Sequence, residues 1–69
     1  MIVEEVTKTE DPVRRLRHDI ANPLAAILAE TQLLLLDPDR YDAETLDSLR
    51  QIEALSRTMR DILNRSKTP

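Results

Sequence analysis

Residues 17–28 read Arg-His-Asp-Ile-Ala-Asn-Pro-Leu-Ala-Ala-Ile-Leu, and this stretch holds His18, the only histidine of the 69-residue chain. Successive residues of an α-helix are about 100° apart around its axis, so apolar side chains three and four positions apart share a face. Around this stretch, that face consists of Val13, Leu16, Ile20, Leu24, Ile27, Thr31 and Leu34. His18 lies roughly 150° from the centre of this face, which places its imidazole on the exposed side of the predicted helix.

The exposed side of the same helix also carries small residues, at spacings of one and two turns from the histidine. The neighbours of His18 on this side are Arg14, Ala21, Asn22, Ala25 and Ala29. Because alanine side chains allow another backbone to approach closely, we expect Arg14 and the three alanines to form a docking surface for a protein partner.

The order His18-Asp19-Ile20-Ala21-Asn22-Pro23-Leu24 resembles the H-box of sensor histidine kinases. In that motif, the histidine is followed by an acidic residue, by Thr or Asn at the fourth position after it, and then by Pro and Leu. A proline within a helix costs about 3 kcal/mol. Random drift would rarely place one five residues after a histidine. The chain therefore resembles the dimerisation and histidine-phosphotransfer (HisKA-type) domain of these kinases.

The resemblance implies a role for each residue of the motif. His18 would be the phosphoacceptor, which takes the γ-phosphoryl group of ATP and passes it to an aspartate of a response-regulator receiver domain. Asp19 would orient the imidazole or act as its general base, and Asn22 would position the water that dephosphorylates the regulator. Pro23 would kink the helix so that its upper part flexes when the catalytic domain engages.

The nucleotide chemistry is expected outside this chain. The chain contains no glycine, whereas the resemblance implies an ATP-binding domain with Gly-rich boxes. We expect ATP and Mg²⁺ to bind that kinase domain, and the present chain alone to be inactive with ATP, as one part of a longer protein-histidine kinase. No metal is expected at His18, because no second His or Cys exists to complete a site.

Composition narrows the class of protein. The absence of glycine and the abundance of Leu, Ala, Glu and Arg favour an all-α fold. The net charge of −3 comes from interspersed charges, which is not the footprint of a nucleic-acid-binding protein. No uninterrupted apolar run of the sequence, the one at 33–36 included, is long enough to span a membrane. Without a signal peptide or cysteines, we expect a cytoplasmic fragment without membrane contact, whose parent kinase is either soluble or membrane-anchored.

The predicted organisation is a helical hairpin over residues 12–66. Residues 1–11 are interpreted as a lead-in or as the end of an upstream linker helix, and residues 67–69 as a tail toward the ATP-binding domain. The first helix is predicted at 12–36, because Asp11-Pro12 is a typical helix start. The loop is predicted at 37–42, where Pro38 restrains the residue before it. The second helix is predicted at 43–65, with Asp42 as its N-cap.

The apolar stripes of both helices are too wide for a single hairpin. The positions that widen them toward a second neighbour are Leu28, Leu35, Leu55 and Ile62. A two-fold symmetric homodimer that forms a four-helix bundle would cover both stripes. Two alternatives remain open: a stand-alone phosphorelay phosphotransferase, and a purely structural dimerisation hairpin in which the histidine is incidental.

Overall fold

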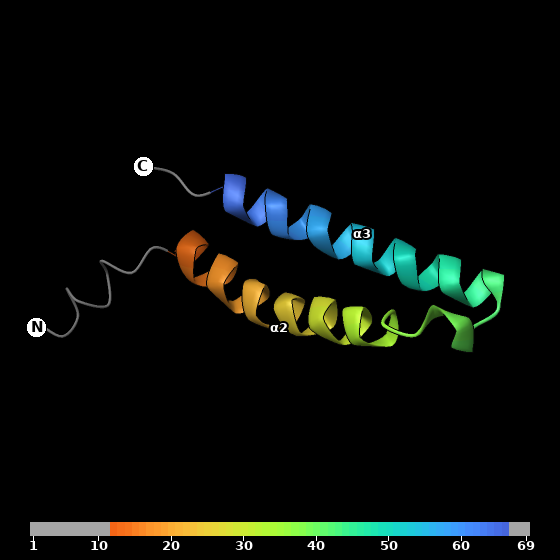
Figure 1. The fold of residues 1–69 in the computed structure, drawn as a ribbon. Coiled ribbons are helices and arrows are strands. Elements are labelled where there is room, and N and C mark those ends of the chain that lie inside the picture. The colour runs from red at the N-terminus through yellow and green to blue at the C-terminus, as the bar shows by residue number, and fades with distance from the viewer. Residues whose placement is uncertain (1–11, 67–69) are drawn as a thin grey trace, which may run out of the picture.

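The computed structural model describes residues 12–66; the lead-in predicted at 1–11 and the tail at 67–69 lie outside them. Two α-helices, α2 (Pro12–Leu34) and α3 (Ala43–Arg65), are joined by a segment that contains the 3₁₀ turn η1 (Pro38–Arg40). Figure 1 shows the helices side by side and antiparallel, with the turn at one end of the hairpin. The described residues contain no strand, so this part of the chain has the predicted all-α hairpin fold.

The end of α2 differs from the prediction, because the helix stops at Leu34 rather than at residue 36. The Leu35 amide still donates to the Thr31 carbonyl at 3.0 Å, but the Leu36 amide donates to the Leu33 carbonyl at 3.2 Å. The last turn therefore tightens from i−4 to i−3 hydrogen bonding. The cause lies further on, since Pro38 disfavours helical geometry at the residue before it. That residue, Asp37, has φ −127° and ψ 76°.

The start of α3 is stabilised by the predicted N-cap. Asp42 has an extended backbone, and its carboxylate accepts a hydrogen bond from the Thr45 amide at 2.8 Å. This bond satisfies one of the amides that have no partner within the helix. The hydrogen bonds from Thr45 stabilise the charged carboxylate and hold the pKa of Asp42 below its ordinary value.

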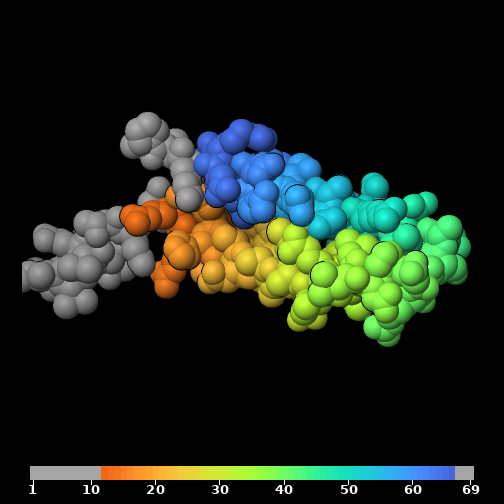
Figure 2. Space-filling model, viewed as in Figure 1, coloured from red at the N-terminus to blue at the C-terminus, as the bar shows by residue number. Residues whose placement is uncertain are grey.

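The seam between the helices is formed by side chains that each helix presents to the other. From α2 and the residue after it, the partly or fully covered side chains are Arg17, Ile20, Ala21, Leu24, Leu28, Thr31 and Leu35. From α3 they are Leu46, Leu49, Glu53, Ser56 and Leu63. Leu24 is the most deeply buried apolar side chain, at 5% exposed, and Thr31 and Ser56 are the buried polar ones. Figure 2 shows the side chains of the two helices in contact along the hairpin.

This seam corrects two details of the predicted apolar face. Leu28 and Leu35, which were assigned to a second neighbour, are partly covered within the hairpin. The members of the predicted face that remain exposed are Val13, Leu16, Ile27 and Leu34. The apolar stripe of α2 is wider than one partner helix can cover, and α3 covers the edge of the stripe that includes Leu28.

Most of the exposed large apolar residues form what we term the apolar side of the hairpin. It consists of Leu16, Ile27, Leu34, Ile52, Leu55, Met59 and Ile62. On a helical wheel, the exposed apolar residues of α2 and those of α3 are rotated away from the seam. In an antiparallel pair, both rotations lead to the same side of the hairpin. Large apolar patches of this kind mark interaction surfaces. Over residues 12–66, neither helix is apolar and long enough to cross a membrane.

Candidate functional site

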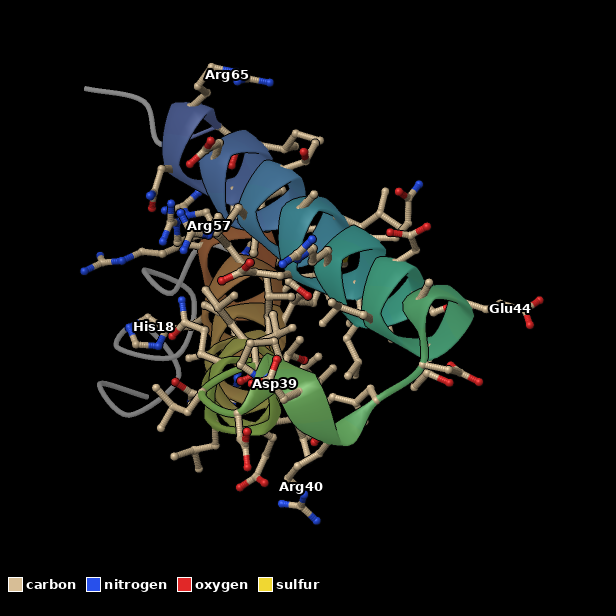
Figure 3. The ribbon with its side chains drawn as sticks, turned by 45° about the vertical axis from the view of Figure 1, so that its right-hand side comes forward. His18, Asp39, Arg40, Glu44, Arg57 and Arg65 are labelled. Atoms are coloured by element: carbon tan, nitrogen blue, oxygen red, sulfur yellow. The ribbon has the colours of Figure 1, made fainter. Side chains whose placement is uncertain are left out.

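His18 stands in the second turn of α2, with its side chain exposed. In Figure 3 its imidazole projects outward from the helix rather than toward α3. The exposed position follows from the helical spacing, because the seam residues Arg17 and Ala21 on either side of it face α3. The imidazole is thus open to a reactant from solvent, while the helix that carries it is held in place by the seam.

Asp19 and Asn22 are exposed beside the histidine. Asp19 is the next residue on the helix, about 100° around the axis, and the two side chains form no hydrogen bond with each other in the described structure. Asn22 lies one turn beyond His18, about 6 Å along the axis on a neighbouring part of the surface. Its amide likewise makes no hydrogen bond within residues 12–66, so both its donor and its acceptor face solvent.

Pro23 lies inside α2, and the helix continues through it to Leu34. Proline has no amide hydrogen, so the carbonyl of Asp19, four residues earlier, lacks its helical donor. The missing hydrogen bond therefore falls within the turn that follows His18. This turn therefore has one backbone hydrogen bond fewer than a regular helical turn.

A groove runs along the hairpin on the side opposite the apolar side and begins three residues after His18. It has a volume of about 260 Å³ and is lined by Ala21, Leu24, Ala25, Leu28, Ala29, Gln32, Arg60, Leu63 and Asn64. The three predicted docking alanines therefore form one wall of a real concavity. Arg14 is exposed one turn before His18 and does not line this groove.

The sequence did not predict the opposite wall of the groove, which α3 forms. Arg60, Leu63 and Asn64 come from the last turns of α3 and face the alanines across the groove. Sequence patterning shows that Arg60 lies off the apolar stripe of its helix, but it does not show which turn of α2 lies beside it. That pairing requires the register of the hairpin, which depends on the conformation of the turn.

The exposed imidazole and the groove beside it limit the chemistry that this site can support. Within residues 12–66, no group of three or more His, Cys, Asp or Glu side chains is placed to hold a metal ion. An imidazole can act as a nucleophile, and the adjacent groove is lined mostly by small and apolar side chains, which suit contact with a protein surface. The arrangement can therefore accept a transferable group and dock a second protein at adjacent positions.

The family model of the His Kinase A (phospho-acceptor) domain matches residues 11–68, which is most of the chain. No curated protein matches the chain, and no solved structure does either.

Proposed function

The chain belongs to the His Kinase A (phospho-acceptor) domain family, and from this premise we propose that His18 is its phosphoacceptor. The observation that carries the proposal is the exposed imidazole of His18 within the His-Asp-x-x-Asn-Pro-Leu motif. Domains of this family are the phosphoacceptor and dimerisation parts of histidine kinases, which are transferases of two-component signalling. The residue roles given below are our assignments for this chain.

In the first step, a lone pair on a ring nitrogen of His18 attacks the γ-phosphorus of ATP. The bond from that phosphorus to the β–γ bridging oxygen breaks, and ADP leaves with the electron pair. The imidazole proton must then be lost to give a neutral phosphoimidazole, and Asp19 is the carboxylate nearest in sequence to receive it. ATP and Mg²⁺ are supplied by a kinase ATP-binding domain, and since the reaction consumes ATP we place the site in the cytoplasm.

In the second step, an aspartate carboxylate of a response-regulator receiver domain attacks the same phosphorus. The phosphorus–nitrogen bond breaks, an acyl phosphate forms on the regulator, and the imidazole recovers a proton. The groove that begins at Ala21 is the surface on which we place the receiver domain, because it adjoins His18 and is lined by small side chains. Arg14, one turn before His18, would contact the regulator at the other edge of the site.

The reverse function is regulator dephosphorylation, which we assign to Asn22. A water must be held in line with the aspartyl phosphate, and the Asn22 amide can both donate to and accept from that water. Its exposed position, one turn beyond His18 and without a hydrogen bond in the described structure, leaves both groups available.

We also propose that two copies of the chain pair through the apolar side. The exposed Leu, Ile and Met side chains of the apolar side come from both helices, and a two-fold symmetric pair would bury them in a four-helix bundle. This pairing leaves His18 and the groove accessible, because they lie on other sides of the hairpin.

The test is phosphorylation in trans. The chain is incubated with the ATP-binding domain of its parent kinase and with Mg²⁺-ATP labelled at the γ-phosphate, beside the His18→Gln variant and an Arg17→Gln control. We expect label on the wild type and on the control, none on His18→Gln, and equal helical circular dichroism for all three. Label that survives His18→Gln would place the acceptor elsewhere. A dimer that takes no label at all would favour the purely structural alternative.

A further inference from the structure

The charges of the described residues divide the hairpin into two halves. The half that carries His18, residues 12–28 of α2 and 54–66 of α3, holds six arginines and two carboxylates, and we term it the positive half. The half that contains the turn, residues 29–53, holds two arginines and seven carboxylates. A phosphoryl group on a side chain adds about two negative charges at pH 7. On His18 that group would lie in the positive half, where the field of the protein favours an anion.

Arg14 is the arginine placed to meet the phosphoryl group directly. It precedes His18 by four residues, so the two side chains are about 40° apart around the helix axis and one turn apart along it. A histidine side chain in a helix leans toward the N-terminus, over the turn that precedes it. A phosphoryl group on a ring nitrogen of His18 would therefore extend over the turn that carries the Arg14 guanidinium.

The Arg14 side chain has no competing partner. It is exposed, and within residues 12–66 it forms no hydrogen bond and no ion pair. The nearest described carboxylate along α2 is that of Asp19, five residues later and about 140° around the helix axis. All the donors of the Arg14 guanidinium are therefore available to an anion.

The other arginines of the positive half are engaged or turned elsewhere. On α3, the Arg57 guanidinium bonds a carboxylate at 3.1 Å, and that of Arg60 lies 3.5 Å from one. Arg65 points away from the imidazole of the candidate site (Figure 3). On α2, Arg15 already takes part in another interaction, and Arg17 is partly covered at the seam. None of these five is both free and one turn from the imidazole.

We propose that Arg14 binds the phosphoryl group of phosphorylated His18. Its guanidinium donates two hydrogen bonds to phosphoryl oxygens, a geometry that the planar fork of arginine matches. The guanidinium holds the group in its doubly charged form until transfer, and is then free again for its contact with the regulator. The inference rests on the proposed function only in taking His18 as the site of the phosphoryl group.

The test loads His18 chemically, so that it needs no kinase. The ring nitrogen attacks the phosphorus of phosphoramidate, the phosphorus–nitrogen bond of the reagent breaks, ammonia leaves with the electron pair, and solvent takes the imidazole proton. His18 is the only histidine of the chain, so one phosphohistidine forms. The loaded wild type is titrated by ³¹P NMR beside Arg14→Gln, Arg14→Lys and a control, Arg50→Gln, which removes an exposed arginine of the other half.

A neighbouring cation favours the doubly charged phosphoryl group, so its removal should make that group easier to protonate. We expect Arg14→Gln to lower the acid dissociation constant of the phosphoryl group about threefold, the scale of an exposed ion pair. Arg14→Lys should retain at least half of the effect because the charge remains. Arg50→Gln should titrate as the wild type does, because position 50 is more than a Debye length from the histidine. The unphosphorylated variants should melt with the wild type, since Arg14 has no partner to lose.

Two results would overturn the inference. One is an Arg14→Gln chain that titrates as the wild type does, and the other is an equal change in Arg14→Gln and Arg50→Gln, which would reflect net charge alone. The proposed function fails separately. A chain that shows the Arg14 effect after chemical loading, but takes no label from ATP and the parent kinase domain, would refute that function and support this inference.

Discussion

The two open sides of the hairpin are built from the same helices and differ in almost everything else. The apolar side exposes large side chains such as Leu16 and Leu55 from both helices, whereas the groove side exposes small side chains and the histidine. Large apolar side chains gain most from complete burial, which a permanent partner provides. Alanine side chains leave room for a partner that binds and dissociates. On this basis we propose that the apolar side serves assembly and that the groove side serves a partner that is exchanged.

If this division is right, substitutions on one side should leave the other side intact. A substitution on the apolar side should change the oligomeric state more than the phosphotransfer activity. A substitution on the groove side should change the phosphotransfer activity more than the oligomeric state. The seam itself should affect both.

Dimerisation through the apolar side is disrupted most directly by Leu55→Asp. Each Leu burial contributes roughly 1.5–3 kcal/mol, and two-fold symmetry repeats it. The dimer should therefore weaken by about 10²-fold or more, measured by light scattering across a dilution series. Ala54→Asp, on the adjacent exposed residue, should leave the dimer intact. A wild-type chain that stays a folded monomer at high micromolar concentration would refute the four-helix bundle.

The groove side is tested by the substitution Asn22→Ala in the parent kinase. Phosphorylation of His18 should be nearly unchanged, while dephosphorylation of the regulator should slow by about 10²-fold, because the water loses its positioning group. Asn22→Thr should retain much of the rate, since threonine also offers a donor and an acceptor. Equal loss of both activities, together with a lower melting temperature, would instead assign Asn22 a structural role.

The seam between the two sides is tested by Leu24→Ala, with Leu36→Ala as the exposed control. Leu24 is 5% exposed and Leu36 is 77% exposed. The free energy of unfolding should fall by about 2 kcal/mol or more for Leu24→Ala, and by under about 0.5 kcal/mol for Leu36→Ala. Denaturant titration at one protomer concentration gives both values. Equal costs would mean that the seam does not run through Leu24.

The smallest effect is expected at the turn, which belongs to neither side. Because the pKa of Asp42 is lowered in the folded chain, its charged form stabilises α3 above the ordinary pKa, and this contribution is lost as pH falls through the lowered value. Asp42→Ala should lower the melting temperature by several degrees at pH 7, and the gap to the wild type should narrow near pH 3. Asp39→Ala should change little. A gap that widens with acid would contradict the capping role.

Local signals in the sequence were enough for the features that depend on a few neighbouring residues. The cap of α3 follows from Asp42, and the exposure of His18 follows from helical spacing. The end of α2 was harder, because the apolar pattern continues to Leu36 while the geometry imposed by Pro38 ends the helix at Leu34.

Features that depend on pairing could not be read from one helix at a time. Periodicity gives the width of an apolar stripe but not which edge a partner covers, so Leu28 was assigned to a second neighbour although it lies toward the seam. For the same reason, Arg60 and Asn64 were missed as groove residues. Their place opposite Ala21 and Ala25 depends on the register of the hairpin.

The central claim is that the phosphate resides on the imidazole of His18. The most direct measurement is site mapping of the labelled wild-type chain, by its stability in acid and base and by fragmentation mass spectrometry of the intact phosphoprotein. The account predicts a single phosphate on His18 that is lost in acid and stable in base, as a phosphoramidate is. A phosphate that is stable in acid, or that maps to any Ser, Thr or carboxylate side chain, would contradict it.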